Sequence, residues 1–141
     1  MYIFDTERIT KWVEDQIGDD ILSYDIRAIG QVNENGELVA GAVFSGYNGA
    51  HIILSLACQK PMHRQFIAMM FDYPFNKAGV NRLTAFIKSN NQKSIHLAQR
   101  LGFVLESTLQ QATLDADLQI YRMFKNECRF ITDRYLKALG G

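Results

Sequence analysis

Three cationic side chains near the middle of the chain could bind an anion. Lys60, His63 and Arg64 lie within five positions of one another, around Pro61. Because proline is favoured at the first position of a helix, we expect a helix to begin at Pro61, with the cations beside its N-terminus. Free amides and the helix dipole attract anions there, and the three side chains could add ionic contacts. The alternative is that they simply lie in solvent at a helix start.

The two cysteines offer thiol chemistry. Cys58 and Cys128 are far apart and have no partner cluster, so the sequence predicts neither a disulfide framework nor a CxxC-type metal site. Cys58 could be a covalent nucleophile only if a base lowered its pKa, and no neighbour in the sequence does so. We therefore expect Cys58 to pack as a small apolar side chain, and we expect no metal site.

The composition is that of a compact globular protein. The chain has 141 residues, 48% of them hydrophobic, with 15 basic and 15 acidic side chains. This length predicts one domain over residues 1–141, and the charge balance argues against broad nucleic-acid binding. Asp5, Glu7 and Arg8 interrupt the start where a secretory peptide would be apolar, and no apolar run reaches the ~18 residues of a membrane span. We expect a cytoplasmic protein with no membrane partner.

The first half of the chain predicts a helix followed by three strands. Apolar residues at helical spacing indicate a helix over residues 5–17, capped by Asp5 or Thr6 and ended by Gly18. Strands are predicted over 27–32, 38–44 and 51–58, with a hairpin turn at Asn33 to Gly36. The last of these strands is apolar on both faces, so we expect it at the centre of the sheet, covered on both sides.

The second half predicts a parallel crossover and a terminal hairpin. We expect a helix over 62–71 that breaks at Tyr73-Pro74, a strand over 82–88 parallel to 51–58, and a helix that ends at Gly102. Strands over 103–109 and 118–124 and a helix over 126–139 complete the chain. The predicted fold class is α/β with a mixed sheet: an antiparallel meander, one central parallel strand-helix-strand crossover, and a C-terminal hairpin and helix.

One stretch carries a family resemblance. Residues 91–106, NQKSIHLAQRLGFVLE, resemble the N-x-x-[AS]-I-x-L-x-x-x-L-G-F-x-x-E signature of the GNAT superfamily of acetyl-CoA-dependent N-acyltransferases. Weaker matches resemble the short GNAT-like proteins of tailed phages and prophages, which are related to the ribosomal-protein acetyltransferases. These matches are residues 71–76, Gly79, Arg82, Asp117, Tyr121 and Glu127. The resemblance covers roughly residues 28–130.

The resemblance implies an acetyl-CoA site between strands 51–58 and 82–88, which should splay apart. In such enzymes the pantetheine arm completes the backbone ladder at the end of the first strand, and the pyrophosphate lies on amides at the start of the next helix. An Asn at the start of the following helix forms a hydrogen bond with the pantetheine arm. The residues that match these positions are Leu56, Ala57, Cys58, Gln59, His63, Arg64, Asn91 and Ser94.

The phosphate loop departs from the family pattern. Where relatives have Q/R-x-x-G-x-G/A, this chain has Gln59-Lys60-Pro61-Met62-His63-Arg64, so both glycine positions hold bulky side chains. Pro61 also removes one N–H donor. The cations of this loop could replace amide contacts with ionic ones.

The resemblance also implies a proton acceptor and a proton donor. Acyl transfer needs a neutral amine, so a carboxylate or His must receive its proton. Glu106 is our first candidate for the base and His51 the second. Many relatives use a Tyr as the acid at the position that holds Ala98 here. Tyr121 is the substitute we would test, with Ser94 or a water next.

The predicted function is N-acetyltransfer from acetyl-CoA to a primary amine, on a small molecule or a protein. Two alternatives remain: a GNAT-like fold that has lost catalysis and binds proteins, and a sensor that binds CoA without turnover. We also expect a homodimer, because the superfamily often forms one. The C-terminal residues Phe130, Ile131, Tyr135 and Leu139 could pair with a second copy or cover the sheet.

Overall fold

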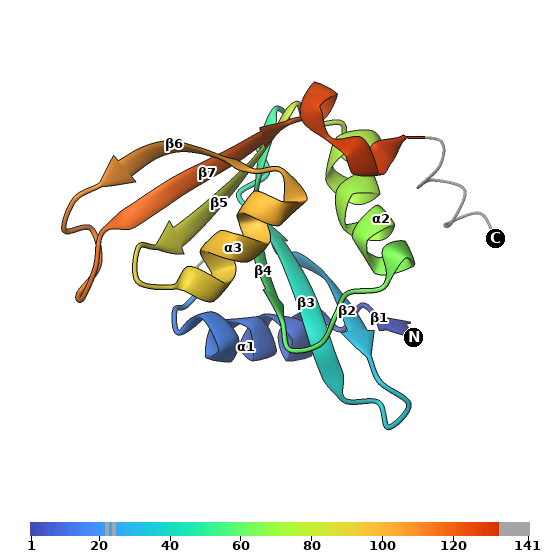
Figure 1. Cartoon of the computed structure of the whole chain (residues 1–141). Helices are drawn as coiled ribbons and strands as arrows, with labels where there is room; N and C mark the ends of the chain where they lie inside the picture. Colours follow the sequence, from blue (N-terminus) through green and yellow to red (C-terminus); the bar gives the residue numbers. More distant parts are fainter. Residues whose placement is uncertain (22, 24, 133–141) are drawn as a thin grey trace.

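The computed structural model describes residues 1–21, 23 and 25–132. The described strands form one seven-stranded sheet in the order β1-β2-β3-β4-β5-β7-β6 (Figure 1). Only β4 (His51–Cys58) and β5 (Arg82–Lys88) pair in parallel among these described strands. The others are β1 (Tyr2–Ile3), β2 (Arg27–Val32), β3 (Leu38–Ser45), β6 (Val104–Leu109) and β7 (Leu118–Phe124). The predicted mixed sheet, with its meander, crossover and terminal hairpin, is confirmed, whereas β1 was not foreseen.

The first helix, α1 (Thr6–Ile17), has both of its predicted end signals. The Asp5 carboxylate accepts a hydrogen bond from the Arg8 amide at 3.2 Å, which satisfies one of the free donors of the first turn. Gly18 ends the helix with a φ of 72°, a left-handed conformation that suits glycine. The boundaries of α1 therefore follow from local residues.

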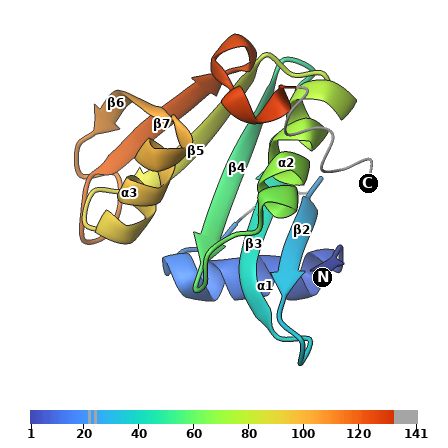
Figure 2. The ribbon, with the colours of Figure 1, turned by 45° about the vertical axis from the view of Figure 1, so that its right-hand side comes forward.

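The helices cover the two faces of the sheet unequally. On one face Ile9 and Val13 of α1 are fully buried against β2 and β3. A Cβ added at Gly41 of β3 would lie 2.8 Å from Val13 Cγ2, so glycine lets α1 approach closely. On the other face lie α2 (Arg64–Asp72) and α3 (Gln92–Leu101), as Figures 1 and 2 show. Because α1 lies over β2 to β4, it leaves its face of the β5-β7-β6 half uncovered.

The two parallel strands separate along their length (Figure 2). β4 and β5 are paired only from His51 with Arg82 to Ile53 with Thr84. Beyond that point β4 stays paired with β3, and β5 stays paired with β7. The expected splay between the strands is therefore present, and it begins one residue after Ile53.

The splay also explains why β4 is less buried than predicted. Ile52 and Leu54 are buried, but His51, Ile53 and Ser55 are only half-buried. The strand is central in the sheet, yet the expectation that it is covered on both sides is wrong for its half-buried residues, because α1 reaches β5 only at its C-terminal end, where Lys88 donates to the Gly18 carbonyl at 3.5 Å.

The second helix begins later than predicted. α2 starts at Arg64 and not at Pro61, because residues 59–63 are held against β2 and β3 by hydrogen bonds. Its end is as expected: the α-helix stops at Asp72, and the chain continues as a π-helical turn, η1 (Tyr73–Lys77), that contains Pro74. The predicted left-handed end of α3 at Gly102 is confirmed, with a φ of 105°.

The predicted C-terminal helix is wrong over its described part. The chain forms two short 3₁₀ helices, η2 (Lys125–Glu127) and η3 (Arg129–Ile131). The Glu127 carboxylate accepts the Phe124 amide, which closes a tight turn in place of an α-helix. Phe130 is buried and stacks on Phe71, with ring centroids 5.0 Å apart. Residues 133–139, with Tyr135 and Leu139, lie outside the described residues.

Candidate functional site

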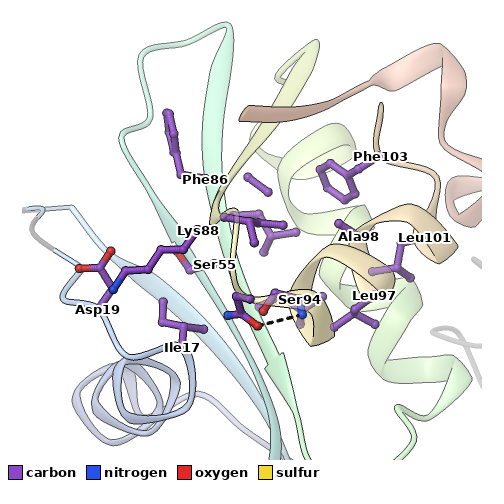
Figure 3. Close-up of a pocket in the computed structure, with 15 residues that line it drawn as sticks. Ile17, Asp19, Ser55, Phe86, Lys88, Ser94, Leu97, Ala98, Leu101 and Phe103 are labelled. Atoms are coloured by element: carbon purple, nitrogen blue, oxygen red, sulfur yellow. Dashed lines mark hydrogen bonds between the residues drawn. The ribbon is translucent and has the colours of Figure 1, made fainter. Parts of the chain in front are cut away.

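The splay leaves a cavity between β4, β5 and α3, with about 600 Å³ of empty space that includes its opening to solvent (Figure 3). Leu54, Ser55 and Leu56 line it from β4, and Ala85 to Lys88 line it from β5. Ala98 and Leu101 of α3 form part of its apolar floor, with Asp19 and Lys88 together at one end (Figure 3). The cavity is lined mostly by apolar side chains with a few polar groups among them, which suits a ligand of mixed apolar and polar character.

The end of β4 could extend a backbone ladder to a ligand. Leu56 lines the cavity, and Ala57 and Cys58 follow it to the end of the strand. The three residues pair with β3 on one side, and on the other side the pairing of β4 with β5 has already ended at Ile53. The structure thus brings Leu56 into the cavity and places Ala57 and Cys58 at its margin.

Asn91 and Ser94 meet at the mouth of the cavity, and both line it. The Asn91 side-chain oxygen accepts the Ser94 amide at 3.2 Å, which caps α3 (Figure 3). This leaves the Asn91 side-chain NH₂ as a donor at the mouth. The capping role expected of Asn91 is confirmed. Its side-chain NH₂ group lies at the cavity, where it could donate a hydrogen bond to a polar group of a bound ligand.

The cationic loop lies apart from the cavity. Gln59, His63 and Arg64 are exposed, and none of them is among the residues that line the described cavity. The side-chain amide of Gln59 donates to Gln16 of α1 at 3.1 Å. The structure therefore does not gather all the predicted binding residues at one place: Leu56, Asn91 and Ser94 meet, and the loop residues lie outside.

Most backbone donors of this loop are already used. The amides of Gln59 and Lys60 both donate to the Val39 carbonyl, at 2.8 and 3.4 Å. The His63 amide donates to the side-chain oxygen of Gln31 at 2.7 Å. Gln31 is 2% exposed, so this bond is shielded from water. Residues 59–61 and 63 therefore offer no amide to a pyrophosphate, whereas the N-terminus of α2 has no side-chain cap and keeps first-turn amides that an anion could meet.

A chain of polar contacts lies where β4 and β5 part, on the face that α1 leaves uncovered. His51 Nε2 is 2.7 Å from the Thr84 hydroxyl, which also accepts the Nε–H of Arg82 at 2.9 Å. Thr84 is buried, and it occupies the last paired position of β5. Burial lowers the pKa of His51, and the Arg82 charge lowers it further. The imidazole is therefore neutral at pH 7 and can accept a proton.

Glu106 lies at the end of the same chain. The β6–β7 register shifts between Leu105 and Ser107, so Glu106 is the extra residue of a β-bulge. Its carboxylate binds both terminal nitrogens of Arg82, at 3.0 and 2.5 Å. The hydrogen bonds from Arg82 hold the pKa of Glu106 below its usual value, and the Arg122 charge adds to the effect. A carboxylate held in this way is a weak base.

Tyr121 lies on β7 and is not among the residues that line the cavity. It lies directly opposite Ala85, which lines the cavity, and it is 2% exposed. Its hydroxyl donates to the side-chain oxygen of Gln119 at 2.8 Å. Burial raises the pKa of Tyr121, so the phenol stays protonated at neutral pH and can donate a proton.

Two residues of this region were missed in the sequence. Thr84 and Gln31 are buried polar residues within otherwise apolar strands. A buried hydroxyl or amide needs a hydrogen-bond partner, so a polar residue inside an apolar run indicates a buried hydrogen bond to a distant part of the chain. Gln31 holds the loop before α2, and Thr84 holds His51 beside the splay.

Other chemistries find less support in the described residues. Within them, no three His, Cys, Asp or Glu side chains are grouped as ligands for a metal ion. Burial raises the pKa of the Cys128 thiol, and both cysteines are free. In the part of the chain that the structure describes, no helix has the length and apolar character needed to cross a membrane.

Comparison with known proteins gives the fold. No family model and no curated protein sequence matches the chain. Among solved structures, spermidine N-acetyltransferase SpeG from Vibrio cholerae is similar: its dodecameric form in an intermediate state has a TM-score of 0.70 at 14% identity, over 95% of this chain and 96% of that one. A structure of mutant forms of SpeG, there called a spermidine/spermine N-acetyltransferase, has a TM-score of 0.68 at 12% identity, over 97% of both chains. A SpeG chimera with hSSAT has a TM-score of 0.61 at 17% identity, over 79% of this chain and 70% of that one. At these identities the likeness concerns the fold, and the chain has the GNAT-like fold of these N-acetyltransferases.

Proposed function

We propose that this protein is an N-acetyltransferase that transfers the acetyl group of acetyl-CoA to a primary amine. The observation that carries the proposal is the cavity between the splayed β4 and β5, with the Asn91 amide at its mouth. A narrow cavity with a free backbone edge along Leu56 suits the pantetheine arm of an acyl thioester. The GNAT-like fold supports the same use, because the similar solved structures are N-acetyltransferases.

In the proposed reaction the neutral amine attacks the thioester carbonyl. A C–N bond forms, the C–S bond breaks, the amine gives up one proton, and the leaving sulfur takes one up. His51 and Glu106 are the candidate acceptors of the amine proton. His51 is the better supported, because it is neutral and lies beside the splay, whereas Arg82 already holds the Glu106 carboxylate. Tyr121 is the candidate donor to sulfur, with Ser94 or a water as alternatives.

The acceptor should approach from the face of the sheet that α1 leaves uncovered. Phe86 is 43% exposed there, two residues after Thr84 on the same face of β5, and it lines the cavity. An amine on this face could therefore reach the cavity without passing α3. The similar solved structures are named as spermidine acetyltransferases, so spermidine belongs in the first panel of acceptors. A peptide N-terminus, a peptide lysine and a small neutral amine complete the panel.

The test is calorimetric titration with acetyl-CoA and with CoA, followed by a thiol-release assay over the amine panel. Wild type should bind in the micromolar range. Asn91→Ala should weaken binding at least tenfold, and Lys93→Ala, an exposed change on the same helix, should not. Acetylated product, identified by mass spectrometry, would support the proposal. Absence of binding at millimolar acetyl-CoA would overturn it.

A second function is favoured by one specific observation. The amides of Gln59, Lys60 and His63 are already bonded within the chain, and Ala98 stands where many relatives have a catalytic Tyr. A GNAT-like protein that no longer transfers acetyl groups would act by binding another protein, as the resemblance to phage proteins implies, or by sensing CoA. Binding without transfer would favour the sensor, and no binding would favour the protein-interaction module.

The proposed oligomeric state is a homodimer. One of the similar solved structures is described as a dodecamer, so association between copies occurs within this fold. Size-exclusion chromatography with light scattering tests the proposal, and a monomer at all concentrations would exclude it.

A further inference from the structure

An apolar patch lies on the face of β5, β7 and β6 that α1 leaves uncovered, and it consists of Phe86, Leu109, Leu118 and Ile120. Tyr121 of β7 packs in the core, so its neighbour Ile120 points to the other face. Phe86 lies directly opposite Ile120, and Leu109 lies directly opposite Leu118, so the four side chains share that face. Phe86 and Leu109 are 43% and 44% exposed, and the other two are half-buried. The patch therefore offers apolar surface to a ligand.

The apolar patch is continuous with the proposed reaction site. Phe86 belongs to the patch and also lines the cavity between β4 and β5. Thr84 lies two residues earlier on the same face of β5, and its hydroxyl is 2.7 Å from Nε2 of His51, the better supported base. An amine whose nitrogen lies beside His51 therefore has the patch within reach of its carbon chain.

The carboxylates on one side of the apolar patch are already bonded. Glu106 binds both terminal nitrogens of Arg82. Glu127 accepts hydrogen bonds from Arg122 at 2.6 Å and from the Phe124 amide at 2.9 Å. Arg122 also lies 3.9 Å from Glu106, so the two acids and the two arginines neutralise one another. A cationic ligand would have to compete with a guanidinium group for either carboxylate.

The other side of the apolar patch carries a lysine. Lys88 follows Phe86 on the same face of β5, and its ammonium lies 3.6 Å from the Asp115 carboxylate and 3.5 Å from the Gly18 carbonyl. Asp19 is the one acidic side chain among the described residues that line the cavity, and Lys88 lies beside it (Figure 3). A second ammonium group of a ligand therefore meets a positive charge at this end too.

These charges distinguish monoamines from polyamines. The reacting amine must lose its proton before it attacks the thioester, so a bound monoamine is then neutral. A polyamine keeps at least one ammonium group, which Arg82, Arg122 and Lys88 repel. The apolar patch stabilises an alkyl or aryl group and gives nothing to an ammonium group. Both effects favour an acceptor that has one amine and an apolar remainder.

We propose that the acceptor is a primary amine that carries a single positive charge and an apolar group. The inference rests on the proposed function and names the acceptor class of its site: alkyl or arylalkyl monoamines, either free or as the N-terminus of a peptide whose first side chain is apolar. The amine nitrogen forms a bond to the acetyl carbon, and the C–S bond of the thioester breaks. The base takes the amine proton, and the leaving sulfur takes up one proton.

The test compares two amines of equal length with the wild-type protein at saturating acetyl-CoA. Hexylamine and cadaverine have the same backbone, but hexylamine ends in a methyl group where cadaverine has a second ammonium group. We expect kcat/KM to be at least about tenfold higher for hexylamine, with most of the difference in KM. From ethylamine through butylamine to hexylamine, kcat/KM should rise by up to about fourfold for each added methylene.

Peptides that begin with Phe or with Ser distinguish the two sources of the same chemistry. The Phe peptide should be acetylated faster than the Ser peptide, because only its first side chain can lie on the apolar patch. If the Phe peptide also exceeds phenethylamine in kcat/KM, the source of the acceptor is a protein N-terminus. If phenethylamine exceeds the Phe peptide, the source is a free amine.

A charge placed in the apolar patch should reverse the preference. Ile120→Glu puts a carboxylate directly opposite Phe86, so kcat/KM should rise for cadaverine and fall for hexylamine. Leu105→Glu is the matched control, because Leu105 is 47% exposed and lies opposite Tyr121, on the other face of the sheet. It should change neither value. Ile120→Thr adds no charge and should only lower kcat/KM for hexylamine, which keeps the test usable if Ile120→Glu does not fold.

The contrary outcomes separate the inference from the proposed function. If cadaverine or spermidine is acetylated as efficiently as hexylamine, or if kcat/KM does not depend on chain length, the inference falls and the proposed function stands. If acetyl-CoA binds but neither class of amine reacts, the inference also falls. If acetyl-CoA does not bind at all, the proposed function falls, and the inference falls with it.

Discussion

Arg82 and Glu106 form a bidentate ion pair that spans β7, the strand between them. Arg82 is on β5 and Glu106 is on β6, with the Arg82 terminal nitrogens 3.0 and 2.5 Å from the carboxylate oxygens. The bulge at Glu106 turns its side chain toward Arg82, and Arg82 in turn bonds Thr84, which bonds His51. A carboxylate at the far edge of the sheet is thereby connected to an imidazole beside the splay.

The first prediction concerns the pKa of His51. Burial and the Arg82 charge lower it from its usual value near 6.5, so Arg82→Gln should raise it toward that value while burial keeps it below. NMR titration of the imidazole resonances measures the change, with His51→Gln to assign them. Lys93→Gln, an exposed change far along the chain, is the control and should leave the pKa of His51 unchanged. A His51 pKa that does not move in Arg82→Gln would contradict the contact chain.

The same shift predicts a pH dependence of stability. Because the folded state disfavours protonated His51, the unfolded state binds more protons below about pH 6.5, and stability falls as the pH drops through that range. Arg82→Gln should flatten this slope between about pH 7 and pH 5. Urea unfolding at several pH values measures it. An unchanged slope would mean that the Arg82 charge does not lower the pKa of His51.

Stability should also depend on pH in a second, more acidic range, where the carboxylates of Glu106 and Glu127 titrate. Hydrogen bonds from Arg82 and from the Phe124 amide lower the pKa values of Glu106 and Glu127 below their usual 4.5. Lowered pKa values stabilise the fold above 4.5, and this stabilisation is lost as the pH falls through the folded values. Glu106→Gln and Glu127→Gln should each reduce the loss of stability on acidification. Glu34→Gln, in the exposed Asn33 to Gly36 turn, is the control, and equal effects in all three variants would refute the assignment.

The parts of the fold that the sequence predicted are those with local signals. The ends of α1 and α3 follow from Asp5, Gly18, Asn91 and Gly102, whose capping does not depend on distant residues. The crossover between β4 and β5 follows from the order of apolar runs. These features could be predicted because a few neighbouring residues decide them.

The features that were missed depend on distant partners. Pro61 is a good first helical residue, yet Gln31, thirty positions earlier, holds the loop and moves the start of α2 to Arg64. The C-terminal pattern is helical, but the Glu127 carboxylate and the packing of Phe130 on Phe71 impose 3₁₀ turns. At the site, the contact between Glu106 and Arg82 could not be predicted. The two residues lie on different strands with β7 between them, and a β-bulge at Glu106 is needed to bring them together.

The fourth prediction separates the two roles of Asn91. Asn91→Ala removes the acceptor for the Ser94 amide and should lower the free energy of unfolding by about 1 kcal/mol. Asn91→Asp keeps the acceptor but loses the NH₂ donor at the mouth of the cavity, so stability should be retained while the Kd for acetyl-CoA rises at least about tenfold. Urea unfolding and calorimetry measure the two effects. If Asn91→Asp binds as wild type does, the side chain serves only as a cap.

The last prediction concerns Tyr121 as the proton donor to the leaving sulfur. Tyr121 is buried and pairs across the sheet with the cavity-lining Ala85, and its raised pKa keeps the phenol protonated over the working pH range. Tyr121→Phe removes one hydrogen bond, worth about 1 kcal/mol of stability, but should lower kcat by about a hundredfold if the phenol is the acid. Gln119→Met, which removes the partner and leaves the phenol, is the matched control and should change kcat far less. Because the thiolate must be protonated after the acetyl group has left, acetyl-CoA binding should be the same in all three proteins. An unchanged kcat in Tyr121→Phe would assign the proton to Ser94 or to water, and the bond to Gln119 would then serve only to hold β7.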